Sequence, residues 1–352
     1  MFEALKGVDK NSIVVMPDFF VDRIVTLRSQ EEFCNLLAEK VRFGGGAIRN
    51  IATTERKGGN AVNVAYCLAR LGIKNTTLFT IADELGSAML HKVFSKFGDR
   101  VNLRVEQGRH GRTTSLEFLK SNATKANVML NDAGDNEYFG SEKIDSDETL
   151  KILENANAVI VVNWGSNLKG SQLATFAFSK SAKSFHYIDP ADIESRKDEF
   201  RDFLRNISNN IHALALNENE ANSLGNSLGL NSLLPPNDYD EADVEKAAVQ
   251  ISSNLSINTD IHTRIGAASS NGKEVDFVPA FEVEAKTLTG AGDSWDSANI
   301  LCYLSRISSR ERLMFSNAYA SLYVQSSDAE PPTMEETLEL INTKSTGHVL
   351  DR

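Results

Sequence analysis

The chain has 352 residues, of which 41% are hydrophobic, and this is enough apolar material for one large core. Its 37 lysines and arginines are outnumbered by 48 aspartates and glutamates, so the formal net charge is -11. An acidic surface repels the phosphates of nucleic acids and the head groups of anionic lipids. We therefore expect neither a nucleic acid nor a membrane as a partner.

Cysteine use and the hydropathy of the amino terminus also narrow the class of protein. Cys34, Cys67 and Cys302 are far apart in the chain, so they predict neither a disulfide framework nor a cysteine-based metal site. The stretch MFEALKGVDKNSIVVM lacks the apolar core of a signal peptide, and no window approaches the roughly 18 consecutive apolar residues of a membrane span. We expect a cytoplasmic protein.

Short β-branched apolar runs alternate with stretches of helical periodicity along the chain. We predict strands over 12–16, 76–82, 157–162, 184–188, 211–216 and 259–264. Most of these runs are followed by an amphipathic stretch of helical length, and this alternation is typical of a parallel sheet covered by helices. We predict a single α/β domain over residues 1–352.

Two segments interrupt the alternation. The glycine-rich segment 42–59 has the composition of an excursion from the sheet, and the proline-containing segment 226–243 has that of a surface insertion. A helix is predicted directly after the first segment, because apolar residues recur at helical spacing from Val64 to Leu71 and Gly72 stands where the helix should stop. The run GGGAIRN at 44–50 lacks the full dinucleotide-binding glycine pattern, so we assign it to a lid.

The stretch TGAGDSWD at 289–296 places small residues directly ahead of a predicted helix. Small residues leave the first N–H groups of a helix uncovered, and these groups together with the helix dipole attract an anion. Gly290, Ala291 and Gly292 would form such an anion hole. For Asp293 two interpretations remain open at this point: a cap of the helix, or a base that takes a proton from a nucleophile attacking the bound anion.

This stretch and three others resemble the ribokinase-like (PfkB) family of carbohydrate kinases. The family's second signature is D-T-x-G-A-G-D, and its GAGD core is matched without a gap at 290–293. GGNAVNVAYCLARLG at 58–72 is similar to the first glycine signature, LNENEANSLG at 216–225 contains the family's N-x-x-E, and PDFFVDRIV at 17–25 is placed like its amino-terminal sugar-binding strand. The resemblance implies a mostly parallel central sheet flanked by helices, with a small β-rich lid over about 17–57 and 100–140.

The resemblance also implies a role for each matched residue. Asp293 would be the catalytic base, and Gly290, Ala291 and Gly292 would stabilise the transferred phosphoryl group through backbone N–H groups. Asn217 and Glu220 would orient Mg²⁺, and with Thr263 and Gly266 they would face ATP. The implied substrate-binding residues are Asp22, Gly58, Gly59, Asn60, Asn63 and Asn163. For Asn60, capping of the following helix remains an alternative.

The implied activity is ATP-dependent phosphorylation of a hydroxyl group on a sugar, a sugar phosphate or a nucleoside. The implied partners are this small-molecule substrate and a second copy of the chain, which would form a homodimer through the lid. Two alternatives are a non-catalytic carbohydrate sensor on the same fold and, with less support, an NAD(P)-dependent oxidoreductase. A sensor would have no use for a base at position 293, and an oxidoreductase should bind NAD(P)H tightly.

The chain departs from the family pattern in two loops. Thr287 and Leu288 stand where the signature has Asp and Thr, and the missing carboxylate predicts weak or absent activation by potassium. In the nucleotide loop, Arg264 and Ile265 separate Thr263 from Gly266.

Other polar and aromatic residues are expected to be structural. Asp132 and Asp135 fit a tight turn better than a metal site, and His262 fits a strand better than a catalyst. Trp164 would either stack on a ligand or pack at the edge of the sheet.

Overall fold

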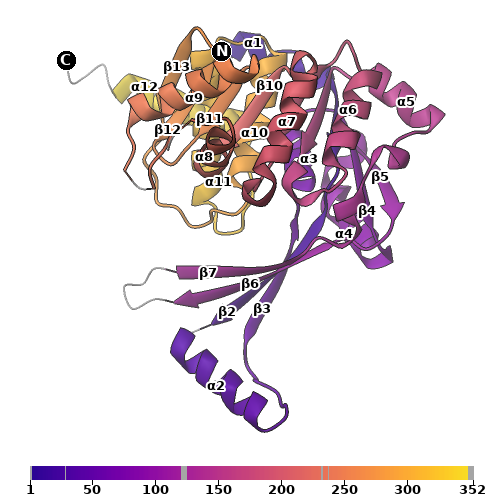
Figure 1. Cartoon of the computed structure of the whole chain (residues 1–352), viewed down its shortest axis with the longest axis vertical. Helices are drawn as coiled ribbons and strands as arrows, with labels where there is room; N and C mark the ends of the chain where they lie inside the picture. The colour runs from indigo at the N-terminus through magenta and orange to yellow at the C-terminus, as the bar shows by residue number, and fades with distance from the viewer. Residues whose placement is uncertain (1, 28, 120–124, 231–232, 237, 348–352) are drawn as a thin grey trace.

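A nine-stranded sheet runs through the body of the molecule (Figure 1). The computed structural model describes residues 2–27, 29–119, 125–230, 233–236 and 238–347. The strands lie in the order β13-β12-β11-β10-β9-β8-β1-β4-β5, and they are parallel from β11 to β5, whereas β12 and β13 are antiparallel to their neighbours. The strands are β1 (Ser12–Met16), β4 (Asn75–Ala82), β5 (Val101–Gln107), β8 (Ala158–Val162), β9 (Phe185–Asp189), β10 (Ala213–Asn217), β11 (Thr259–His262), β12 (Gly266–Ser270) and β13 (Val275–Pro279).

Helices cover both faces of this sheet, as the alternating sequence pattern predicts. Successive residues of a strand point to opposite faces, so Ile13 and Val15 of β1 belong to one hydrophobic cluster, and Val14 and Met16 belong to the other. The first cluster is covered by α3 (Asn60–Arg70), α4 (Glu84–Phe94), α10 (Ala291–Leu304), α11 (Ser309–Gln325) and α12 (Met334–Gly347). The second is covered by α5 (Asp147–Glu154), α6 (Gly170–Lys180), α7 (Lys197–Ile207), α8 (Glu218–Ser227) and α9 (Glu241–Leu255).

A second, four-stranded sheet projects from the body and carries a helix at its far end (Figure 1). Its strand order is β3-β2-β6-β7, with β2 parallel to β6 and the two outer pairs antiparallel. The elements are β2 (Phe20–Leu27), α2 (Gln30–Arg42), β3 (Ala52–Gly58), β6 (Gly111–Leu119) and β7 (Lys125–Asp132), and α2 has no buried residue. The predicted excursion over 100–140 was wrong at its start, because β5 pairs with β4 in the large sheet.

The predicted strands are all present, and the parallel register brings their carboxyl ends to one edge of the sheet. Polar residues stand at or directly beyond those ends: Asp18 after β1, Asn163 after β8, Asp189 in β9, Asn217 in β10 and His262 in β11. In open α/β sheets, ligands bind in the crevice at this edge. None of the described helices has the length and apolar character that crossing a bilayer requires.

Candidate active site

The Asp293 carboxylate lies between the first turns of two packed helices, α10 and α3. The Asn60 side-chain amide donates a hydrogen bond to Asp293 Oδ1, and the Asn63 amide donates one to Oδ2, both at 2.8 Å. These bonds fix the carboxylate in one orientation, while each oxygen keeps capacity for a further proton donor. Asn60 and Asn63 of the first glycine signature therefore contact Asp293 of the second signature, although they lie 233 and 230 residues away from it in the sequence.

Burial makes this carboxylate unusually basic. Asp293 is 6% exposed, and burial raises the pKa of its carboxyl group to about 7, although the hydrogen bonds from Asn63 and Asn60 act in the opposite direction. A carboxylate with a pKa near neutrality is a better proton acceptor than an ordinary aspartate, and about half of it is ionised at neutral pH. These properties are those of a general base, and they favour that role for Asp293 over a simple cap.

The backbone ahead of Asp293 has the geometry of an anion hole, with one correction. Gly290 has φ = 85°, and a side chain there would also meet the Tyr323 hydroxyl oxygen, so this position requires glycine. The Ala291 N–H donates to the Leu288 carbonyl at 3.1 Å, and the prediction that it faces the anion is wrong in this structure. The N–H groups of Gly292 and Asp293 have no backbone acceptor in the described part of the chain, so they can receive an anion.

The second sheet contributes Asp22 and Lys57 to the same region. A Cβ atom at Gly58 would lie within 2.5 Å of the Asp22 carboxylate oxygens, so the bare glycine is what allows Asp22 to lie over the start of α3. The Lys57 ammonium donates to Asn63 Oδ1 at 2.7 Å and lies 4.3 Å from the centre of the Tyr66 ring. Lys57 therefore extends the chain of hydrogen bonds from Asp293 through Asn63, and sequence reasoning missed it.

Asp18 is a second missed residue, and it organises the start of α3. It is 2% exposed, and its carboxylate accepts hydrogen bonds from the backbone N–H groups of Asn60 and Ala61 and from the Asn163 amide, each at 2.9 Å. Gly59 has φ = 93°, and a side chain there would meet the backbone of the segment that carries Asp18. In this structure, the Asn163 amide group is therefore committed to holding Asp18, and Gly59 permits close backbone packing.

Asn217 and Glu220 form a reciprocal capping box at the start of α8. Asn217 Oδ1 accepts from the backbone N–H of Glu220 at 3.0 Å, and the Glu220 carboxylate accepts from both the backbone and the side-chain N–H groups of Asn217. Burial raises the pKa of Glu220 well above its ordinary range, and the neighbouring charge of Asp189 raises it further. A carboxylate held by these hydrogen bonds fits a hydrated Mg²⁺ better than direct ligation by both side chains, and the positive charge of the ion would favour the ionised form of Glu220.

Thr263 and Gly266 close the turn between β11 and β12. The backbone N–H and the hydroxyl of Thr263 both lie 2.8 Å from the Gly266 carbonyl oxygen. A side chain at Gly266 would meet Phe277 and Val278 of β13, so packing alone explains the glycine. The Arg264 guanidinium at this turn is exposed and lies 5.5 Å from the centre of the Tyr239 ring.

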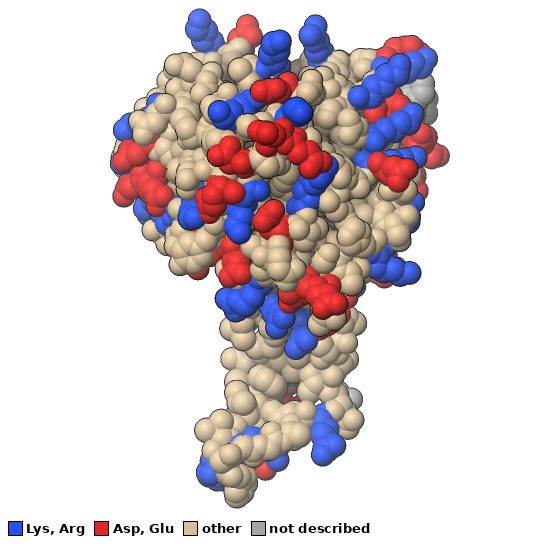
Figure 2. Space-filling view, turned by 90° about the vertical axis from the view of Figure 1, so that its right-hand side faces the viewer, with Lys and Arg blue, Asp and Glu red and all other residues tan. Residues whose placement is uncertain are grey.

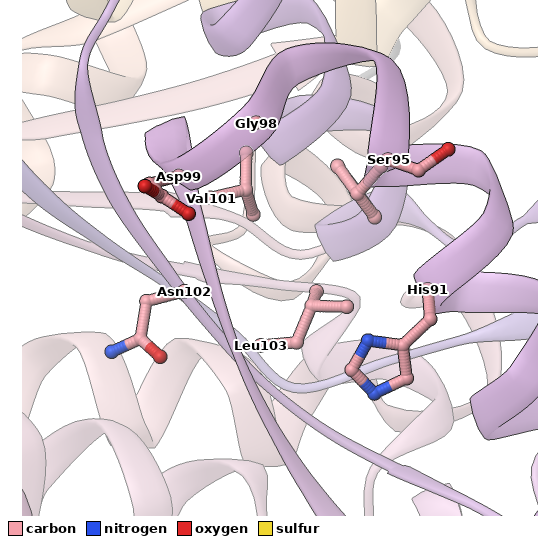
Figure 3. Close-up of a pocket in the computed structure, with 8 residues that line it drawn as sticks. His91, Ser95, Gly98, Asp99, Val101, Asn102 and Leu103 are labelled. Atoms are coloured by element: carbon pink, nitrogen blue, oxygen red, sulfur yellow. The ribbon is translucent and has the colours of Figure 1, made fainter.

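Other polar and aromatic residues are structural where the sequence left alternatives. Trp164 is fully buried against Phe200 and Phe203, so it packs in the core instead of stacking on a ligand. Asp132 and Asp135 accept backbone hydrogen bonds that hold the turn after β7. A surface hollow of about 470 Å³ beside α4 and β5 (Figure 3) is lined by His91, Ser95, Asp99, Asn102 and other residues of this edge, and none of the candidate site residues lines it.

The fold and this site define the class of protein. The mostly parallel sheet flanked by helices, with an additional small sheet, is the ribokinase-like α/β fold. The chain belongs to the pfkB family of carbohydrate kinases, whose model matches residues 30–336.

Solved structures similar to this one share its fold at low sequence identity. The ribokinase of Arabidopsis thaliana, solved with ribose and ATP, is 19% identical with a TM-score of 0.70, covering 94% of this chain and 99% of its own. The Thermotoga maritima ribokinase is 18% identical with a TM-score of 0.67, and the match covers 95% of this chain and 99% of the ribokinase chain. The adenosine kinase of Sinorhizobium meliloti is 18% identical with a TM-score of 0.67, and the match covers 90% of this chain and 94% of the adenosine kinase chain. Among curated proteins, a sequence comparison finds no match for this chain.

Proposed function

We propose that this protein transfers the terminal phosphoryl group of ATP to a hydroxyl group of a sugar, a sugar phosphate or a nucleoside. The observation that carries this proposal is the Asp293 carboxylate, which two amides orient beside N–H groups that are free to receive an anion. Membership of a carbohydrate kinase family supports it. Phosphoryl transfer needs this combination of a positioned proton acceptor and electrostatic stabilisation, with little covalent work by the protein.

Each residue of the site then has a defined task. Asp293 takes the proton of the attacking hydroxyl group, and the N–H groups of Gly292 and Asp293 stabilise the charge on the transferred phosphoryl group. Asp22 accepts hydrogen bonds from hydroxyl groups of the substrate. Asn60 and Asn63 hold the base in position, while Lys57 polarises the Asn63 amide through the hydrogen bond to its oxygen.

Asn217 and Glu220 would hold Mg²⁺ through water molecules. The ion, when bound, neutralises negative charge on the phosphates of the nucleotide. The capping box holds the Glu220 carboxylate rigidly at the carboxyl end of β10. Asn217 and Glu220 would therefore fix the position at which the ion compensates the phosphate charge. The exposed Arg264 stands at the neighbouring turn, where its guanidinium can meet a nucleotide phosphate.

The activity is tested by incubating the full chain with ATP and Mg²⁺ and a panel of sugars, polyols, nucleosides and sugar phosphates. We expect ADP release that depends on one class of acceptor. Tight binding of a sugar without ADP release would support the sensor, and tight binding of NADPH or NADH without turnover of ATP would support the oxidoreductase.

The pH dependence of the reaction should report Asp293. Because the base must be ionised and its pKa is about 7, we expect kcat/KM to rise with pH and level off above a midpoint near 7. The raised pKa has the opposite consequence for folding: the contribution of this group to stability is present in acid and is lost as the pH rises towards 7. A kcat/KM that is flat between pH 5 and pH 8 on a non-ionising substrate would contradict the assignment.

Replacing Glu220 by glutamine tests the proposed magnesium site. The substitution removes the negative charge while preserving size, so we expect the Mg²⁺ concentration for half-maximal rate to rise about tenfold, as is typical for an outer-sphere partner. Glu241→Gln makes the same change on the first turn of α9 and serves as the control. The measurement is the initial rate as a function of Mg²⁺ at fixed ATP, and identical curves for Glu220→Gln and the control would refute the assignment.

We also propose that the second sheet is the lid of one ribokinase-like domain and that two copies associate through it. The surface of its middle part is largely uncharged in the view of Figure 2. Apolar side chains are exposed on this sheet and its helix: Leu37, Val41, Phe43, Val128, Met129 and Leu130. Light scattering on the purified chain should give the mass of a dimer, and Val41→Asp should shift it towards the monomer.

A further inference from the structure

Two buried carboxyl groups and an imidazole lie beside the anion hole without a role in the reaction proposed above. One donor atom from each of Asp189, His262 and Asp296 lies within 4.8 Å of the donor atoms of the other two. Asp189 is 5% exposed and Asp296 is 0% exposed. Two carboxylates at this separation repel each other strongly in a low-dielectric interior unless a cation or a proton lies between them.

Two of the buried polar atoms in this cluster have no hydrogen-bond partner in the described part of the chain. Asp296 Oδ1 accepts a hydrogen bond from the Tyr187 hydroxyl at 2.6 Å, whereas Asp296 Oδ2 has no donor. His262 Nε2 is likewise unpartnered. Buried polar atoms in native proteins are nearly always satisfied, so Asp296 Oδ2 requires a cation or a proton shared with Asp189, and His262 Nε2 requires a ligand of its own.

The donor set indicates the kind of ion. Mg²⁺ prefers ligands that are all oxygen, whereas an imidazole nitrogen combined with carboxylate oxygens suits first-row divalent transition metals. No lysine or arginine in the described part of the chain forms an ion pair with Asp189 or Asp296, so no side-chain cation competes for the position. The Tyr187 hydroxyl already fixes one oxygen of Asp296, as outer partners of metal ligands commonly do.

The cluster lies close to the anion hole. A Cβ atom placed on Gly292 would be 3.4 Å from His262 Cε1 and 3.9 Å from His262 Nε2. The His262 ring also packs against Trp295, with ring centres 4.9 Å apart, so the imidazole is held in one place beside the start of α10. An ion here would be within electrostatic reach of both the anion hole and the Glu220 carboxylate.

We propose that Asp189, His262 and Asp296 form a binding site for a divalent transition-metal ion such as Mn²⁺. Its ligands are distinct from the Asn217 and Glu220 pair. This inference goes beyond the proposed kinase activity, because the three donors are positioned by the ends of β9 and β11 and by α10 whether or not the chain transfers a phosphoryl group. Tyr187 acts as a positioning residue through Asp296.

The test uses the full chain, stripped of metal and titrated with Mn²⁺ alone, with electron paramagnetic resonance as the readout. We expect one bound Mn²⁺ per chain and a nitrogen hyperfine coupling in pulsed spectra, because His262 ligates the ion directly. His262→Gln should abolish the nitrogen coupling, and Asp296→Asn should remove most of the affinity. Tyr187→Phe should weaken binding about tenfold. Asp192→Asn alters an exposed neighbouring carboxylate and should bind Mn²⁺ as the unmodified chain does.

Two results would overturn the proposal. Mn²⁺ bound without nitrogen coupling would assign the ion to Glu220 and its neighbours. Absence of binding, together with an increase in thermal stability on Asp296→Asn, would show that the two carboxyl groups share a proton. If Asp296→Asn does not fold, the comparison of the unmodified chain with His262→Gln decides the question. The ADP-release assay in Mg²⁺ is independent of this result, so a failure of either proposal is recognised separately.

Discussion

Replacing Asp293 by asparagine is expected to lower kcat by about two to four orders of magnitude. The alcohol of the substrate is a weak nucleophile, and an amide at this position cannot take its proton. The affinity for ATP should change by no more than a few-fold, because the Gly292 and Asp293 N–H groups belong to the backbone and remain in place. The measurement combines steady-state kinetics with ATP binding by calorimetry, so that a loss of turnover is separated from a loss of nucleotide binding.

A matched substitution distinguishes the base from an ordinary substrate contact. Asp22→Asn makes the same chemical change on β2, and it should raise KM for the acceptor more than it lowers kcat. If Asp293→Asn turns over at a rate near that of the unmodified chain, or if both variants change only KM, Asp293 is not the base. In that event, its contacts with Asn60 and Asn63 have only a structural purpose.

Six of the nine strands of the large sheet were predictable because they are almost entirely buried, whereas β5, β12 and β13 were not predicted. β8 and the last four residues of β1 are consecutive apolar residues, and such runs stand out between amphipathic helices. The second sheet was harder to predict. β3 has the sequence ATTERKG and its first residues are exposed, so neither alternation nor hydrophobicity marks it as a strand. Its pairing with β2 depends on a partner that the local sequence does not reveal.

The site was predictable only where its residues lie in short motifs. The GAGD and GGNAVN stretches identify the two helix starts that meet at Asp293. Asp18 and Asp296 lie within the stretches PDFFVDRIV and TGAGDSWD, and Asp189 ends a predicted strand, but no motif assigns them a role. Only the order of the strands brings the ends of β1 and β9 to the edge where α10 begins. Lys57 was missed for the same reason, because a lysine before two glycines has no meaning until Asn63 lies beside it.

Breaking the buried ion pair behind the site should have the largest effect on stability. Arg312 is 3% exposed and Asp260 is 0% exposed, and two guanidinium nitrogens lie 3.0 and 3.2 Å from the two carboxylate oxygens. Asn299 of α10 hydrogen-bonds to both partners, so the pair ties α11 and β11 to the helix whose first turn carries Asp293. We expect Arg312→Met to lower the free energy of unfolding by about 3–5 kcal/mol, since it leaves the Asp260 charge buried without compensation.

The measurement is urea denaturation followed by tryptophan fluorescence, with two comparison variants. Arg23→Met removes an ion pair with Glu55 that is more than half exposed, and water screens such a pair, so its loss should cost about 1 kcal/mol or less. The double variant Arg312→Met with Asp260→Leu removes both buried charges and should recover much of the stability that the single variant loses, because the penalty lies in the unpaired charge and not in the absent attraction. A single variant as stable as Arg23→Met, or a double variant no better than the single one, would show that Asp260 finds another partner. In that case, the hydrogen bonds from Tyr303 and Asn299 would be sufficient to hold the charge and the helix that carries the base.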